Sequence, residues 1–165
     1  MPAGDARVQV ERDGQRGNTI SISIADRAPR ILRLGIGDYG ILVNQDGSFP
    51  IPTTPGILSH PARPGDALVM YALGLGGTTP VVQSGAGAPD KEPFARVTPP
   101  PQVRVGGVVQ SGSLITPLFV GLTPNFVGLY QVNFILPVDS PKGSAIPLYL
   151  EGWGVVSNGV NIAIQ

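Results

Sequence analysis

Residues 18–24 read Asn-Thr-Ile-Ser-Ile-Ser-Ile, and this heptapeptide indicates the fold of the chain. Its isoleucines alternate strictly with threonine and serine, so an extended segment has one apolar and one polar face, as in a half-buried antiparallel strand. The alternation recurs in residues 129–136 and 160–164, and no stretch has a convincing 3.6-residue period. The sequence therefore predicts an all-β protein.

The composition fits a folded chain that is rich in turns. The 165 residues include 23 glycines and 18 prolines, but 42% of the chain is hydrophobic and only 13% is charged. Disorder is the weaker interpretation, because such a chain has much apolar surface to bury and little charge repulsion. Its formal net charge is zero. A chain without a basic surplus is not expected to bind nucleic acid.

Two further strand patterns refine the prediction. Residues 67–73 are continuously apolar and follow Pro-Gly-Asp, which predicts a central strand covered on both faces. Residues 103–105 and 108–110 flank Gly106-Gly107, a pair that allows a tight two-residue hairpin.

Two connections are unusually long and rich in proline or glycine, residues 44–65 and 74–101. Segments of this length in a compact domain are either functional or packed as extended edge structure. We expect them to cover sheet edges, with ligand binding as the alternative.

An internal repeat links the two ends of the chain. At a constant offset of 140, the first expected hairpin aligns with the last, and with a slip of one residue the entry 2–6 matches 141–145. The aligned pairs are Val8 with Leu148, Val10 with Leu150, Glu11 with Glu151, Gly14 with Gly154, Asn18 with Asn158, Ile20 with Val160, Ile22 with Ile162 and Ile24 with Ile164. Alternation alone would make any two hairpins similar, but the matching turns, lengths and entry favour duplication.

The repeat predicts how the chain is divided. Residues 1–28 are expected to be the terminal hairpin of a truncated first immunoglobulin-like unit, and residues 29–165 a β-sandwich domain. Unpaired strand edges on such a hairpin favour homo-oligomerisation through it.

Several blocks of this sequence resemble the C-terminal domain of uncharacterised secreted proteins of Solibacter and related acidobacteria. The resemblance covers nearly the whole chain and rests on residues 44–48, 64–66, 71–76, 119–122, 126–133, Pro137 and 157–160. It implies an immunoglobulin-like antiparallel β-sandwich with long Pro/Gly-rich loops. It also implies an extracellular or cell-surface location and other domains of the same protein as partners. The family has no assigned activity, and any export signal is expected upstream of this sequence.

The residues that usually carry catalysis are scarce. His60 is the only histidine, no cysteine is present, and no Gly-x-Ser-x-Gly elbow occurs. We therefore expect no enzyme and no cofactor. Oxygen ligands leave one metal alternative, a calcium loop starting at Asn44, Asp46 and Ser48, but the twelfth position is Pro55 where glutamate is required. A simple β-turn is the preferred interpretation.

Three residues of the last hairpin remain as candidate contacts to a ligand or partner. Tyr149, Glu151 and Trp153 are expected to share a face, and the first copy has Gln9, Glu11 and Asp13 there. Aromatic rings at these positions suit a sugar or a protein partner. Packing beneath a long loop or against the first hairpin is the preferred interpretation of the two rings.

The expected function is a non-catalytic structural or interaction module of a larger exported bacterial protein, acting as spacer, anchor or cap. The alternative is a carbohydrate-binding or adhesion module that uses Tyr149, Trp153 and the long loops. No segment has the apolar length of a membrane span.

Overall fold

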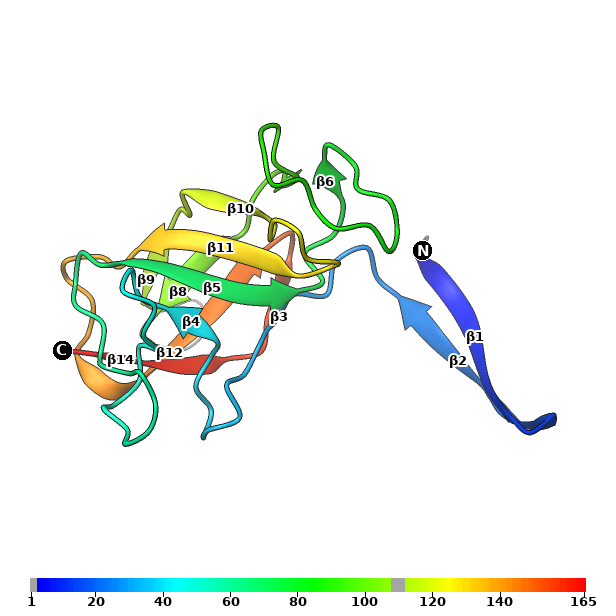
Figure 1. Cartoon of the computed structure of the whole chain (residues 1–165), viewed down its shortest axis with the longest axis horizontal. Coiled ribbons are helices and arrows are strands. Elements are labelled where there is room, and N and C mark those ends of the chain that lie inside the picture. The colour runs from blue at the N-terminus through cyan, green and yellow to red at the C-terminus, as the bar shows by residue number, and fades with distance from the viewer. Residues whose placement is uncertain (1–2, 108–111) are drawn as a thin grey trace.

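A computed structural model describes residues 3–107 and 112–165, and in these ranges the protein consists of strands and loops without a helix (Figure 1). The all-β prediction is confirmed. Within the same ranges, no helix offers the length and apolarity needed to cross a bilayer.

The strands follow one another along the chain, and three of them largely coincide with the alternating segments 18–24, 129–136 and 160–164. They are β1 (Gly4–Arg12), β2 (Gln15–Ile24), β3 (Arg30–Ile31), β4 (Leu42–Val43), β5 (Ala67–Leu73), β6 (Thr78–Thr79), β7 (Arg96–Val97), β8 (Gln102–Val105), β9 (Ser113–Ile115), β10 (Phe119–Leu122), β11 (Tyr130–Ile135), β12 (Gly143–Gly152), β13 (Val155–Val156) and β14 (Val160–Ile164).

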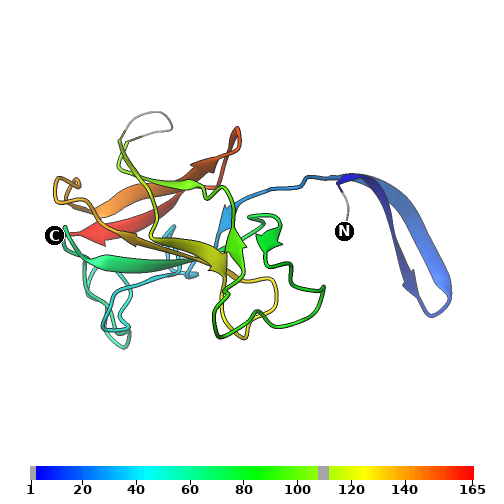
Figure 2. The ribbon, with the colours of Figure 1, turned by 90° about the horizontal axis from the view of Figure 1, so that it is seen from above.

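Two antiparallel sheets form the body of the molecule. One has the order β3-β5-β11-β10-β7-β6, with β4 also paired to β5. The other has the order β13-β12-β8-β9, with β14 also paired to β12. The view from above separates the layers, with β12 and β14 on one side and β5, β11 and β10 on the other (Figure 2). The body is therefore a β-sandwich.

The core lies between the two sheets. Side chains from both layers are fully buried in one cluster, among them Leu68 and Met70 of β5, Phe134 of β11 and Leu148 of β12. β5 lies between β11 and the short strands β3 and β4, which confirms that it is central. Its residues alternate between buried and half-buried, so the expectation that both its faces are covered is wrong. Only the face toward the second sheet is sealed.

Both long connections form edge structure. Residues 44–65 run beside β14, where Ala163 donates a backbone hydrogen bond to Pro50 and accepts one from Ala62, at 2.8 and 2.9 Å. Residues 74–101 contain β6 and β7, which extend the first sheet beyond β10. These contacts agree with the edge-covering interpretation.

The connection after β8 differs from the predicted tight turn. Val105 pairs with Ser113, so the β8–β9 hairpin has a loop that includes Gly106 and Gly107 and is longer than two residues. A two-residue loop would have paired Val105 with residue 108. The strand expected at 108–110 lies outside the described residues.

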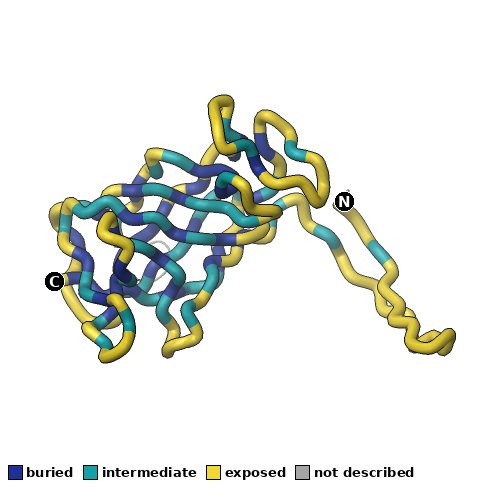
Figure 3. Tube along the Cα trace, viewed as in Figure 1, coloured by how far each residue is buried: buried dark blue, intermediate teal, exposed yellow. Residues whose placement is uncertain are grey.

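The hairpin β1–β2 is a separate two-stranded sheet that projects from the body (Figures 1 and 2). A single extended segment connects Ile24 to β3, where the sandwich begins. Nearly all of the hairpin is exposed, whereas the body is mostly buried or half-buried (Figure 3).

Candidate interaction surface on the N-terminal hairpin

The projecting hairpin has one apolar and one polar face. Residues that pair directly across two antiparallel strands point to the same side. Val8 pairs with Ile20, and Ala6 with Ile22. The neighbouring pairs Asp5–Ser23, Arg7–Ser21 and Gln9–Thr19 form the opposite, polar side.

The apolar face is open to solvent. Val8 is 45% exposed, Val10 71%, Ile20 56% and Ile22 44%. At about 0.8 kcal/mol for each methylene group left in water, such a face is costly in a protein that has no use for it. A contiguous apolar patch of this kind is a mark of an interaction site.

The second hairpin, β12 with β13 and β14, has an equivalent strand register. Leu148 pairs with Val160 as Val8 pairs with Ile20. Nearer the turn, Glu151 pairs with Val156 as Glu11 pairs with Arg16. Both hairpins shift register between these two pairs, and residues 157–159 of the last hairpin align with residues 17–19 of the first.

The strand entries also correspond. Gly4 pairs with Ile24 and Gly143 pairs with Ile164, although the sequences match here only after a slip of one residue. That slip coincides with a second register shift, between Gly143 and Ile146, which accommodates the additional residue. The two hairpins therefore repeat the strand pairing as well as the sequence, and the one-residue insertion in the last hairpin lies at its register shift.

The turns are of one type as well. Asp13 and Gly14 have φ angles of 51° and 76°, and Trp153 and Gly154 have 55° and 78°. Two successive residues in the left-handed region are the requirement of a two-residue type I′ turn. Tryptophan is unusual in this conformation, which asparagine, aspartate and glycine adopt more easily.

The two apolar faces differ in burial. Leu148, Leu150 and Ile162 have no exposed surface, and Val160 and Ile164 are 2% and 3% exposed. The same face of an equivalent hairpin is thus sealed into the sandwich at one end of the chain and open at the other. This contrast makes the β1–β2 face the candidate site.

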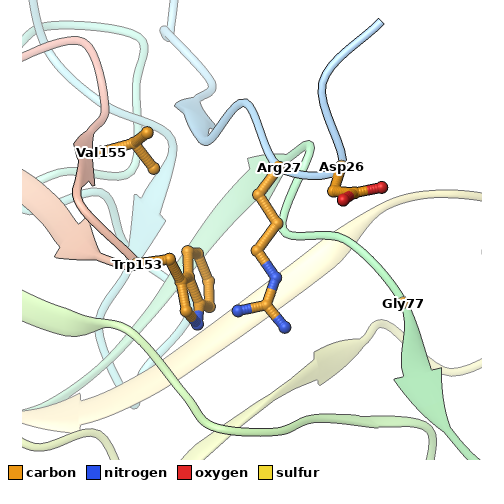
Figure 4. A pocket seen from close by; sticks show the side chains of 5 residues that line it. All are labelled: Asp26, Arg27, Gly77, Trp153 and Val155. Carbon is orange, nitrogen blue, oxygen red and sulfur yellow. The ribbon is translucent and has the colours of Figure 1, made fainter. Parts of the chain in front are cut away.

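The segment that carries the hairpin is attached to the body at Trp153. The guanidinium carbon of Arg27 lies 4.1 Å from the centroid of the indole ring, in cation–π geometry (Figure 4). The indole N–H donates to the carbonyl of Pro99 at 3.1 Å. Asp26, Arg27, Gly77, Trp153 and Val155 line an open depression at this point.

A close backbone contact fixes the segment one residue further on. The Ala28 amide donates to the Gly74 carbonyl at 2.9 Å. A Cβ atom at residue 74 would lie 2.2 Å from the Ala28 oxygen, and the φ angle there is +73°. Glycine is therefore required for the segment to reach the sheet.

The three predicted contact residues take part in contacts within the chain. Trp153 follows the end of β12, so it belongs to the turn and does not share a strand face with Tyr149 and Glu151. The half-buried Tyr149 ring lies against Gly159, where a Cβ atom would approach the ring to 2.6 Å. Glu151 binds Arg104 from the neighbouring strand β8.

The Glu151–Arg104 ion pair is mostly withdrawn from solvent. The carboxylate accepts from Arg104 Nε at 2.7 Å and lies 2.6 Å from its Nη2 atom. The side chains of Arg104 and Glu151 are 5% and 29% exposed. Breaking such a pair would leave a nearly buried guanidinium without its carboxylate.

Asn44, Asp46 and Ser48, the residues of the calcium-loop alternative, hydrogen-bond to one another in a turn. Asp46 Oδ1 accepts from both the amide and the hydroxyl of Ser48, and Asn44 Nδ2 donates to the Ser48 hydroxyl. Gly47 has a φ angle of +85°, which suits the turn interpretation. In the described part of the chain, histidine, aspartate and glutamate side chains form no cluster that could hold a metal ion.

His60 forms an ion pair with this turn. Its Nε2 atom lies 2.9 Å from Asp46 Oδ2, and its Nδ1 atom lies 2.9 Å from the Pro61 carbonyl oxygen. The hydrogen bond to Pro61, and then that to Asp46, raise the pKa of His60 above 6.5. The Ser48 hydroxyl, followed by His60, holds the pKa of Asp46 well below 3.8.

Sequence reasoning missed three residues in these contacts. Arg27 attaches the connection of the first hairpin to Trp153, whereas Arg104 and Asn158 hold the last hairpin in the body. Asn158 accepts from the Ile31 amide at 2.8 Å and donates to its carbonyl at 3.1 Å, which joins the last hairpin to β3. The alignment of Asn18 with Asn158 was the available signal for this role. No comparable signal identifies the other two residues.

Comparisons with protein-family models, curated proteins and solved structures give no match to this chain.

Proposed function

We propose that the protein is a non-catalytic structural or interaction module of a larger exported bacterial protein, in which it serves as a spacer, anchor or cap. The sandwich is proposed to be of the immunoglobulin-like kind, and the setting, extracellular or on the cell surface, comes from the resemblance to the acidobacterial domain.

One observation supports this proposal above the others, the solvent exposure of the β1–β2 apolar face. Its equivalent on β12 and β14 is buried, so the face has the composition of a core surface. The hairpin projects from the sandwich, and the segment that connects the two is held to the body at Arg27 and Ala28. It is therefore well placed to reach another protein surface.

Glycan binding by Tyr149 and Trp153 has weaker support. Arg27 covers a face of the indole ring, and the Pro99 carbonyl occupies its N–H group. A sugar would have to displace Arg27 in order to stack on that face. Binding on a glycan array that disappears in a folded Trp153→Ala variant and strengthens in Arg27→Ala would favour this alternative.

Sedimentation velocity tests the proposed contact role. An uncovered apolar face should drive weak self-association of the chain as its concentration is raised, and replacing Ile20 and Ile22 by serine should abolish it. Serine at Ser21 and Ser23 on the polar face already shows that the strand tolerates this side chain. Arg7→Ser on the polar face is the matched control and should leave association unchanged. A strictly monomeric protein at high concentration would contradict the proposal.

A further inference from the structure

We propose that β1–β2 is the closing hairpin of a second sandwich of the same kind, one that lacks a closing hairpin of its own. There it would take the place that β12–β14 take in this body. This inference rests on the proposed function and names the partner of the exposed face.

The place in question is defined within this chain. On one side, β12 pairs with β8 through Leu148–Val105, Tyr149–Arg104, Leu150–Val103 and Glu151–Gln102. On the inner side, the hairpin seals the core between the two sheets. β1 corresponds to β12, and in the described structure its only strand partner is β2, so its outer edge is free to pair with a β8-like strand.

The face of β1–β2 is apolar at the core-facing positions of the repeat. Val8 and Val10 stand where Leu148 and Leu150 are buried, and Ile20 stands where Val160 is buried. At two further positions both hairpins carry isoleucine: Ile22 aligns with Ile162, and Ile24 aligns with Ile164. Similar volumes at equivalent positions are what a sandwich core accepts.

Two polar residues are retained with the apolar face. Glu11 occupies the position of Glu151, which binds the nearly buried Arg104 of β8. In the isolated hairpin, Glu11 instead forms an exposed ion pair with Arg16 at 3.0 Å. An exposed ion pair contributes little to the free energy of folding. The β1–β2 hairpin alone therefore gives no strong reason for glutamate at position 11.

Asn18 is the second retained residue. Its equivalent Asn158 binds both the amide and the carbonyl of Ile31 and so joins the closing hairpin to the first strand of the body. Asn18 itself is exposed on β2. The apolar face, the glutamate and the asparagine together reproduce the three contacts by which a closing hairpin is held.

A second copy of this chain is the weaker choice of partner. In each copy the place beside β8 is already filled by β12. A copy could accept β1–β2 there only by releasing its own hairpin, with the loss of several fully buried side chains.

A tandem protein tests the inference. In the open tandem, residues 26–140 precede residues 2–165, so the upstream body has no closing hairpin except β1–β2. In the closed tandem, residues 26–165 precede residues 2–165, and the upstream body has its own. Amide hydrogen exchange of Val8 and Ile20 should be about a hundredfold slower in the open tandem than in the closed one.

The ion pair supplies an independent readout. Glu11→Ala should destabilise the upstream body of the open tandem, where Glu11 is expected to meet the upstream Arg104. It should have no measurable effect in the closed tandem, which serves as the matched control. Asn18→Ala should behave in the same way.

Equal exchange of Val8 and Ile20 in the two tandems would overturn the inference, and so would an open tandem whose upstream body fails to fold. The proposed function fails separately. If hairpin exchange is equal in both tandems but self-association through Ile20 and Ile22 persists, the face is an interaction surface with a different partner.

Discussion

The repeat allows one substitution to be made twice, at Ile162 and at Ile22. The two isoleucines are aligned at the offset of 140 and occupy equivalent register positions, opposite Ile146 and Ala6. Ile162 has no exposed surface, whereas Ile22 is 44% exposed. Alanine at each site therefore tests the same side chain in a closed and in an open hairpin.

The expected magnitudes follow from burial. Ile162→Ala removes three carbon atoms from the core, about 2.4 kcal/mol at ~0.8 kcal/mol for each methylene group. A residual cavity adds about 1 kcal/mol, which gives a loss of about 3–4 kcal/mol. For a domain of this size, that loss lowers Tm by about 10 °C. Ile22→Ala should change the free energy of unfolding by less than about 0.5 kcal/mol.

Urea denaturation followed by the fluorescence of Trp153, the only tryptophan, measures both variants in one assay. The indole lies between Arg27 and Pro99 at the surface of the body, so its emission should report unfolding of the sandwich. Similar losses of unfolding free energy at the two sites would contradict the open state of the first hairpin, because they would mean that it is packed into the cooperative unit.

Two further predictions concern charged pairs. Glu151→Ala should cost about 3 kcal/mol of unfolding free energy, the low end for a broken buried pair, because Glu151 is partly exposed. Glu11→Ala in the chain alone is the control, and an equally small effect at both sites would show that the Arg104 pair contributes little. His60→Ala should destabilise the protein most between pH 3.8 and 6.5. The contribution of His60 is lost as pH rises through its raised pKa, and that of Asp46 is lost as pH falls toward its lowered pKa. Urea titrations across this range check the window, and an effect of His60→Ala that is independent of pH would contradict it.

The alternation of apolar residues predicted most of the long strands, because a period of two needs only local information. Residues 18–24 and 160–164 are strands as expected. The sequence could not predict that one apolar face is sealed and the other open, since burial depends on what lies opposite. The aligned core-facing residues are apolar in both hairpins.

The candidate site was predictable only in part. Asp13 and Trp153 diverge between the two copies, and Trp153 contacts Arg27 and Pro99, which lie far away in sequence and could not be predicted as its partners. The expectation of a tight turn at Gly106-Gly107 failed because glycine pairs permit many loop geometries, and the pairing of Val105 with Ser113 sets this one.

The two hairpins share one register and differ in whether a sandwich surrounds them. Native-state amide hydrogen exchange of the full chain measures this difference, by comparing Leu148 and Val160 with Val8 and Ile20. Leu148 and Val160 should exchange only by global unfolding, and Val8 and Ile20 should exchange orders of magnitude faster, because an isolated two-stranded hairpin is marginally stable. Equal protection of the two pairs in a monomeric protein would contradict this difference.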